Sequence, residues 1–445
     1  MISAYGYYWK HRRFGGVFKE QLLQFKKREE FDLEQWRDYR TIQLRKLLVH
    51  SFETVPLYNE KYKNAGFSSD KLKKFELDDL NSLPFLEKEE LRKYGQSKLM
   101  SENKDKKGAF YSSSGSTGTP TNIYYSLTFH QTWSAAFEAR IRNWAGIDRF
   151  TPRGMIGGRR IIPEAKSNGP FYRYNAAEKQ TYLSAYHISE KNAENYIEGI
   201  KKHNVEYMTG YAISNYLLAQ MVNELGLKAP QLKAVITSSE KLTQEMRDLF
   251  KRVYKCKTFD SYSGVEACGL ISENQDGELL VSPDVGIIEV INDEKECQIE
   301  QGEGELVSTG LLNFDQPLIR YRIGDRIKMA STATKSKSQM PLVEEISGRI
   351  EDIVMGPDGR KMVRFHGVFI DITGLINAQL VQEDINWIRL RLQVNKEFDR
   401  KSELLIKNRL SSQLGEVKIT FEYPESIGLN KNGKFKAVIS KLKSS

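Results

Sequence analysis

The stretch AFYSSSGSTGTPTNIYYS, residues 109–126, decides how the rest of the chain is interpreted. Of the eight residues from Ser112 to Thr119, six are Ser or Thr and two are Gly. Aromatic and β-branched residues on both sides predict one strand before this segment and another after it. Glycine lets backbone N–H groups approach an anion closely, and the hydroxyls add further donors. The pattern predicts a phosphate-binding turn between two strands, with a flexible Ser/Gly linker as the alternative.

The composition is that of a globular protein with more than one structural unit. The chain has 445 residues, of which 40% are hydrophobic and 28% charged. It contains no run of about 18 apolar residues, so we expect no transmembrane span. The first residues, MISAYGYYWKHRRFGG, lack the apolar core of a signal peptide. Three cysteines are too few for a disulfide framework, and together these features predict a cytoplasmic protein.

The chain is basic, with a net charge of +9 and a pI of about 9.1. Such proteins often meet anions, namely nucleic acid, lipid or phosphorylated small molecules, although a lysine-rich solvated surface gives the same excess. Lys and Arg are spread along the chain and form no nucleic-acid-binding module, so we expect no nucleic acid partner. A local excess occurs in LNKNGKFKAVISKLKSS, residues 429–445, which has five lysines and no acid.

Hydrophobic periodicity divides the chain into three parts. Residues 1–105 are predicted to be mainly helical, and strands alternate with helices from 109 to 290, which indicates an α/β fold with a largely parallel sheet. Residues 279–330 are strand-rich, with turns predicted at EGE and IGD. Beyond a boundary near SGRIEDIVMGPDGR, two predicted strands flank a helix and form a small α+β unit. We therefore predict one domain over 1–350 and a second over 351–445.

Common nucleotide and metal motifs are absent: there is no GxxxxGK[ST], HExxH, CxxC pair or GxGxxG. Five other stretches occur in order: SSSGSTGTPT (112–121), YSGVE (262–266), RYRIGD (320–325), GRIED (348–352) and NGKFK (432–436). Together they resemble the core motifs of the adenylate-forming superfamily, which includes acyl-CoA synthetases, luciferases and peptide-synthetase adenylation domains. VPLYNEKY and TGYAISNYLLA are similar to the phenylacetate–CoA ligase-like branch, within it to the capsular-polysaccharide-biosynthesis subgroup.

The resemblance implies a large N-terminal adenylate-forming domain of layered sheets and helices, followed by a small mobile α+β domain. It implies an ATP-dependent, AMP-forming ligase that uses Mg²⁺ and joins a small carboxylic acid to AMP. The acyl group would pass to an acceptor thiol, amine or sugar, nucleotide- or lipid-linked, in capsule, O-antigen or exopolysaccharide synthesis. Coenzyme A is the alternative acceptor, as in phenylacetate–CoA ligases. A nucleotide-binding scaffold without catalysis is the alternative of another class.

The resemblance assigns the glycine-rich turn to the β- and γ-phosphates of ATP. The residues implied are Ser113, Ser114, Gly115, Ser116, Thr117 and Gly118. Many members of the superfamily end this motif with Pro-Lys, whereas this chain has Pro120-Thr121, as is common in the phenylacetate-like branch.

Tyr262 would stack on adenine, and Glu266 would coordinate Mg²⁺, for which carboxylate oxygen is a suitable ligand. Ser263 stands where the motif usually has Gly. Ser239 and Glu240 belong to SSEKL, which lines the adenine and acyl pockets in relatives and also has Ser in place of Gly. These serines predict a narrower or more polar acyl pocket. Taken alone, Glu266 is better explained as a surface acid at a strand end.

Asp325 would accept hydrogen bonds from both ribose hydroxyls, and Arg349 would complement the ribose and phosphates. A turn aspartate after Gly324 is the alternative for Asp325. Glu351 occupies the hinge position between the two domains, where most relatives have Asp or Lys. The two domains would therefore close over a nucleotide bound near Asp325.

Lys434 is the candidate catalytic lysine, because an ammonium can stabilise the negative charge that develops around the α-phosphorus. Lys431 and Lys436 compete for this role, and a solvated basic tail is the structural alternative. Residues implied at the acyl or acceptor pocket are Arg159, Arg160, His187 and Tyr211. A solvated arginine pair and a structural histidine are the alternatives there. Peripheral association with a membrane and the oligomeric state stay open.

Overall fold

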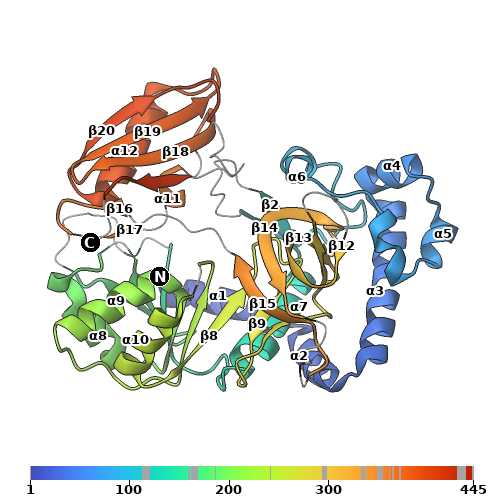
Figure 1. Ribbon diagram of the computed structural model, residues 1–445, viewed down its shortest axis with the longest axis horizontal. Coiled ribbons are helices and arrows are strands. Elements are labelled where there is room, and N and C mark those ends of the chain that lie inside the picture. The colour runs from blue at the N-terminus through green and yellow to red at the C-terminus, as the bar shows by residue number, and fades with distance from the viewer. Residues whose placement is uncertain are drawn as a thin grey trace.

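The structure is a computed structural model, and it describes residues 2–112, 121–158, 161, 169–185, 187–240, 242–292, 298–331, 336, 338–347, 354–359, 361–362, 365–369, 372–427 and 437–442. The chain runs from an N-terminal helical part through a large sheet to a smaller lobe (Figure 1). None of the described helices is long and apolar enough to cross a lipid bilayer.

The first hundred residues form helices, as the periodicity predicts. They are α1 (Ile2–Phe14), α2 (Phe18–Lys27), η1 (Arg28–Glu30), α3 (Leu33–Thr54), α4 (Pro56–Asn64), α5 (Ser69–Lys73), η2 (Leu77–Ser82) and α6 (Lys88–Tyr94). Asp32 and Gln35 form a reciprocal capping box at the start of α3. Pro56 begins α4 at a position where a helix needs no N–H donor. The break between these two helices is therefore local in origin.

Strands and helices then alternate and build the parallel half of the large sheet. The parallel strands are β3 (Arg153–Gly157), β5 (Gln180–Ser184), β6 (Tyr207–Tyr211), β7 (Ala234–Ser238) and β8 (Lys257–Tyr262). The edge strand β4 (Tyr172–Asn175) is antiparallel to β5. The intervening helices are α8 (Glu190–Lys202), α9 (Ala212–Glu224) and α10 (Gln244–Tyr254), which lie at the opposite end of the molecule from α3–α5 (Figure 1).

The second half of this sheet is antiparallel. Its strands are β9 (Ile271–Glu273), β10 (Leu279–Val281), β11 (Gly286–Ile291), β12 (Gln298–Ile299), β13 (Gly302–Gly310), β14 (Tyr321–Met329) and β15 (Leu342–Ser347). In the described part of the chain, the full strand order is β12-β11-β13-β14-β15-β10-β9-β8-β7-β6-β3-β5-β4.

The turns predicted at EGE (303–305) and IGD (323–325) are wrong, because both segments lie inside long strands. The pairing of β13 with β14 shifts register between Glu305 and Val307, and Gly324 has a φ of 86°. A bulge admits extra residues while the two strands continue to pair on either side. Glycine and acidic residues therefore mark a bulge here, although the same residue types favour turns.

Three further groups of elements complete the fold. Strands β1 (Ala109–Ser112) and β2 (Asn122–Tyr125) form a hairpin, followed by α7 (Leu127–Phe137) and η3 (Glu138–Asn143). The smaller lobe contains β16 (Val354–Met355), β17 (Lys361–Met362), α11 (His366–Phe369), β18 (Leu375–Asp384), β19 (Trp387–Val394), α12 (Arg400–Leu414), β20 (Lys418–Glu422) and β21 (Val438–Ser440). Its sheet has the order β20-β19-β18-β21 and its own hydrophobic core. The predicted α/β fold with a small α+β unit is confirmed.

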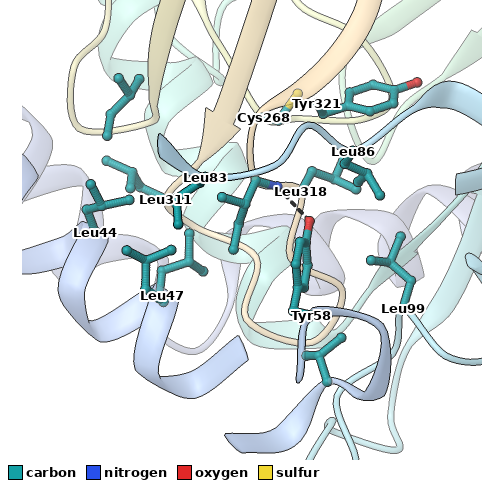
Figure 2. Close-up of a cluster of buried hydrophobic side chains, with 14 of the residues drawn as sticks. Leu44, Leu47, Tyr58, Leu83, Leu86, Leu99, Cys268, Leu311, Leu318 and Tyr321 are labelled. Atoms are coloured by element: carbon teal, nitrogen blue, oxygen red, sulfur yellow. Dashed lines mark hydrogen bonds between the residues drawn. The ribbon is translucent and has the colours of Figure 1, made fainter. Parts of the chain in front are cut away.

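One hydrophobic core joins the N-terminal helices to the segment that leads into β14 (Figure 2). Its labelled members include Leu44, Leu47, Leu83, Leu311 and Leu318. The fully buried hydroxyl of Tyr58 accepts a 2.9 Å hydrogen bond from the Ile319 N–H and donates one of 3.2 Å to the Pro317 carbonyl. Because a buried hydroxyl requires partners, these bonds fix the segment before β14 against α4.

The hairpin β1–β2 is supported by α1 and α7. Arg12 in α1 donates to the carbonyl of Tyr125 at 3.0 Å and to Nδ1 of His130 at 3.3 Å. The Trp9 ring packs edge-on against Tyr111 in β1 and His130 in α7. Burial, together with the nearby arginines, lowers the pKa of His130 to about 3. His130 is therefore neutral and accepts the hydrogen bond from Arg12.

We expect this contact to make stability depend on pH. A histidine with a lowered pKa stabilises the fold fully above its unfolded pKa of about 6.5, and this contribution is lost as the pH falls towards 3. Wild type should lose up to about 1.4 kcal/mol per pH unit below 6.5 relative to His130→Gln, which keeps an acceptor for Arg12. Urea unfolding of both proteins between pH 7.5 and 4.5 measures this. Equal slopes for the two proteins would contradict it.

Candidate active site at the carboxyl edge of the sheet

The carboxyl ends of the parallel strands meet at one edge of the large sheet. The pairing places Gly157 beside Ser184, and Ser238 beside both Tyr211 and Ser261. Loops that follow these strands therefore project from the same edge. In open α/β sheets ligands bind in the crevice outside the carboxyl ends of the strands, so this edge is the candidate active site.

Tyr262, at the end of β8, contacts Asp325 in β14. Its hydroxyl donates a 2.8 Å hydrogen bond to Oδ2 of Asp325. Burial raises the pKa of Tyr262 well above its usual range, and the nearby Asp325 carboxylate raises it further. The phenol therefore stays protonated and donates the hydrogen bond. Strands β8, β9, β10, β15 and β14 follow one another in the sheet, and four steps along a flat sheet would span about 19 Å. The sheet therefore curls to bring the two residues together.

A second contact joins the hairpin to the loop after β8. The Thr121 hydroxyl donates to Oε1 of Glu266 at 3.0 Å, and the Tyr125 hydroxyl donates to the Val265 carbonyl at 2.7 Å. Thr121 is buried and stands where many members of the superfamily have Lys. The predicted residues Tyr262, Glu266 and Asp325 are thus brought into one region with Thr121. The sequence interpretation noted Thr121 but gave it no role.

Strand β2 of the hairpin is held in place by side-chain hydrogen bonds. The fully buried Gln316 accepts from the Tyr124 N–H at 2.6 Å and donates to the carbonyls of Asn122 at 3.1 Å and Gly95 at 2.7 Å. Asn313 donates to the Tyr124 carbonyl at 3.1 Å. These amides occupy the backbone groups that a neighbouring strand would otherwise bond. The sequence analysis missed Gln316, for which a lone amide before Pro317 gives no distinctive signal.

The segment after β7 places Ser239 and Glu240 near the start of α9. Ser239 has a φ of 73°, in the left-handed region that favours glycine. The Glu240 carboxylate accepts a 2.8 Å hydrogen bond from the N–H of Ile213 in the first turn of α9. A carboxylate is favoured there by the helix dipole. Glu240 thus links β7 to α9, while Ser263, beside Tyr262, is half-buried.

His187 and Tyr211 lie near the ends of β5 and β6. His187 is buried, with Nδ1 within 2.7 Å of the Ser184 hydroxyl, and its ring stacks on Phe171 at 5.0 Å. A Cβ at Gly158 would lie 2.7 Å from the Tyr211 hydroxyl, so the phenol packs directly against the glycine backbone. His187 is thus part of the packed interior beside the edge, and Tyr211 stands at the edge itself.

Several predicted site residues lie outside the described residues. They are Ser113, Ser114, Gly115, Ser116, Thr117, Gly118, Arg159, Arg160, Arg349, Glu351 and Lys434. Among the residues that are described, no three His, Cys, Asp or Glu side chains gather as a metal site would require. Glu266 offers a carboxylate oxygen of the kind that Mg²⁺ binds, and in nucleotide sites this ion usually also binds phosphate oxygens.

The chain is similar in sequence to several known proteins. A model of the CapK C-terminal domain matches residues 354–441. Protein CapK of Staphylococcus aureus is 26% identical over 402 residues, which cover 87% of each chain. Phenylacetate-coenzyme A ligase of Escherichia coli (strain K12) is 26% identical over 395 residues, covering 84% of this chain and 82% of that one. Over most of its length the chain is thus similar to protein CapK and to phenylacetate-coenzyme A ligases, which supports the predicted adenylate-forming superfamily.

Within the adenylate-forming superfamily, the fold is shared with a solved ligase. A crystal structure of 2-hydroxyisobutyryl-CoA ligase in the postadenylation state, in complex with R3-HIB-AMP, matches with a TM-score of 0.58 and 16% identity. The match covers 93% of this chain and 91% of that one. The predicted superfamily, the CapK-like subgroup and the enzyme class, an AMP-forming ligase, are confirmed.

We expect Gln316→Ala to destabilise this adenylate-forming chain by roughly 3 kcal/mol, because it leaves buried backbone groups of the hairpin without partners. Gln244→Ala is the matched control, since the exposed amide of Gln244 bonds only Asp248 on α10 among the described residues, and it should cost less than about 0.5 kcal/mol. Urea unfolding measures both. A loss at Gln316 no larger than at Gln244 would contradict the support given to β2.

Proposed function

We propose that this chain activates a small carboxylic acid with Mg·ATP as an acyl-adenylate and transfers the acyl group during synthesis of a bacterial surface polysaccharide. The observation that carries the proposal is the convergence of Thr121, Tyr262, Glu266 and Asp325 at the carboxyl edge of one sheet. These residues come from three separated segments, and both carboxylates lie close enough to Tyr262 to raise its pKa. The resemblance of VPLYNEKY and TGYAISNYLLA to the capsular-polysaccharide-biosynthesis subgroup supports the polysaccharide role.

In this proposal Asp325 accepts hydrogen bonds from the ribose hydroxyls, and the Tyr262 ring lies beside the adenine. Ser113–Gly118 donate to the β- and γ-phosphates. Glu266 holds Mg²⁺, which when bound neutralises charge on the phosphate oxygens. An oxygen of the acid then bonds to the α-phosphorus while the bond to pyrophosphate breaks, giving acyl-AMP and pyrophosphate.

The small unit, residues 351–445, acts in the proposal as a lid that rotates at Glu351. Closing brings Lys434 to the α-phosphate, where its ammonium stabilises the charge that develops as pyrophosphate leaves. Arg349 lies just before the hinge and complements the ribose and phosphates. The match of residues 354–441 to a C-terminal domain family supports treating this unit as a domain.

Transfer completes the reaction: an acceptor thiol, amine or hydroxyl attacks the acyl carbon, and AMP leaves. The polysaccharide role favours an amine or hydroxyl on a nucleotide- or lipid-linked sugar, placed in the cytoplasm, where ATP is available. Coenzyme A is the second candidate acceptor, because three relatives of this chain are named as CoA ligases. Arg159, Arg160, His187 and Tyr211 are proposed to border the acyl and acceptor region.

The first half-reaction is tested by ATP–pyrophosphate exchange with a panel of small carboxylic acids. We expect acid-dependent exchange in wild type and a loss of about 100-fold or more in Lys434→Ala, with ATP binding retained. Lys431→Ala and Lys436→Ala are matched controls on the same segment and should keep most of the activity. Folded wild type that exchanges with no acid, yet binds ATP, would instead favour a nucleotide-binding scaffold.

The contact between Thr121 and Glu266 should determine how tightly the ATP complex binds a divalent metal ion. Thr121→Val removes the hydroxyl at nearly constant volume and frees the carboxylate to rotate, so Mn²⁺ affinity of the ATP complex should fall about tenfold. Electron paramagnetic resonance of bound Mn²⁺ measures this without acid turnover. Thr121→Ser keeps the hydroxyl and should restore binding. Unchanged Mn²⁺ affinity in Thr121→Val would show that the hydroxyl does not position Glu266.

A further inference from the structure

The first helix, α1, is attached to the rest of the molecule along one face. Arg12 donates to the Tyr125 carbonyl at 3.0 Å, and the Trp9 ring packs edge-on against aromatic rings of β1 and α7. Gly6 lies directly against Asn175, because a Cβ at this glycine would overlap the Asn175 side chain. These contacts fix which face of α1 points inward, and therefore also which face points outward.

The outward face of α1 carries aromatic side chains that are exposed. Tyr7 is 66% exposed and Tyr8 is 56% exposed. The exposed side chains of Lys10 and His11 follow Tyr7 by three and four residues, so they lie beside it on the helix surface. Single exposed apolar residues are normal, but large ones that gather on one short helix mark an interaction site.

The second helix, α2, presents the same combination of side chains. Leu23 is 67% exposed. Lys19, Lys26 and Lys27 are three or four residues away from it along the helix and are exposed too, so lysines surround Leu23. Buried phenylalanines attach the other face of α2 to the core. Both helices pack against α7, and only residues 15–17 join them, so one flat partner can contact both.

The N-terminal surface, defined as the exposed side chains of α1 and α2, has a strong bias of charge. Among its described side chains, four lysines are exposed and Glu20 is the one exposed acid. Protein–protein interfaces are depleted in lysine, whereas tyrosine, leucine and lysine on one face are typical of helices that lie on anionic bilayers. Lysine can bury its stem beside apolar groups while its ammonium reaches a phosphate. Composition and charge therefore favour a lipid partner.

We infer that the N-terminal surface docks this protein on an anionic lipid bilayer. Tyr7, Tyr8 and Leu23 enter the interfacial region of the bilayer, and the lysines contact the headgroup phosphates. The lysines supply the attraction to anionic lipid, and the apolar side chains add the free energy of their burial. The inference goes beyond the proposed function and does not require it. Under that function, docking would hold the enzyme beside a lipid-linked acceptor.

Co-sedimentation of the full chain with lipid vesicles tests the inference. We expect binding to vesicles of equal parts phosphatidylcholine and phosphatidylglycerol, and far weaker binding to phosphatidylcholine alone. Salt at about 1 M should weaken the binding by screening. Lys26→Gln should weaken it about fivefold, and Tyr7→Ser combined with Leu23→Ser about tenfold. Because Tyr7 and Leu23 are mostly exposed, the double variant should unfold at the wild-type temperature.

Matched changes on α12 of the smaller lobe serve as controls. Leu404 is 56% exposed and Lys407 is exposed, so Leu404→Ser and Lys407→Gln should leave vesicle binding unchanged. Controls that weaken binding as much as the N-terminal variants would overturn the inference. Wild type that binds neither kind of vesicle, or both equally, would also overturn it.

Two further measurements separate the remaining outcomes. Wild type that self-associates through Tyr7 and Leu23 in analytical ultracentrifugation, and binds no vesicles, would overturn the inference and assign the surface to contacts between copies of this chain. ATP–pyrophosphate exchange without vesicles should be equal in wild type and in the Tyr7→Ser, Leu23→Ser double variant. Wild type that binds vesicles but shows no exchange would contradict the proposed function and leave the docking surface supported.

Discussion

The candidate site depends on one constraint, the curling of the large sheet. Its parallel half presents strand ends at a common edge, but Asp325 lies in the antiparallel half, four strands from β8. Only a sheet that turns back on itself places Tyr262 within hydrogen-bond distance of Asp325. The bulge in β13 and β14 belongs to this curvature, since bulges bend strands and increase their twist. The irregular strand and the site thus have a common origin.

The hairpin that precedes the site is held by a different principle. In the described part of the chain its strands pair only with each other, and a two-stranded hairpin alone is marginally stable in water. Its remaining backbone groups are bonded by side chains, chiefly the Gln316 amide and the Arg12 guanidinium. Gln316 stands a few residues before β14, so the same segment that positions Asp325 also supports the hairpin. The segment around Gln316 therefore connects the hairpin β1–β2 to the strand β14 that carries Asp325.

The local elements could be predicted from the sequence because their causes are local. Periodicity and Pro56 give the helices, and short apolar runs such as that around Ile236 give the buried strands. The EGE and IGD segments misled the prediction because glycine and acidic residues favour turns and bulges alike. The contacts of Tyr262 with Asp325 and of Thr121 with Glu266 join distant segments, so no local pattern specifies them. The motifs identified these residues in the sequence, but only the folded structure shows which of them contact each other.

The charges in the described part of the site suggest different roles for two groups of residues. Neutral donors orient the carboxylates, and cationic residues elsewhere in the chain would stabilise the phosphates. Thr121 and Tyr262 donate hydrogen bonds to Glu266 and Asp325 through neutral hydroxyls, which bring no positive charge to these two side chains. In the proposed function a triphosphate would lie beside them, and hydroxyl and backbone donors could orient its negative charge but not neutralise it. Under the proposed function, positive charge would then come from a metal ion and from cationic side chains elsewhere in the chain. Arg349 and Lys434 are candidates for these side chains, and a lysine that arrives only on closure would confine that stabilisation to the reacting complex.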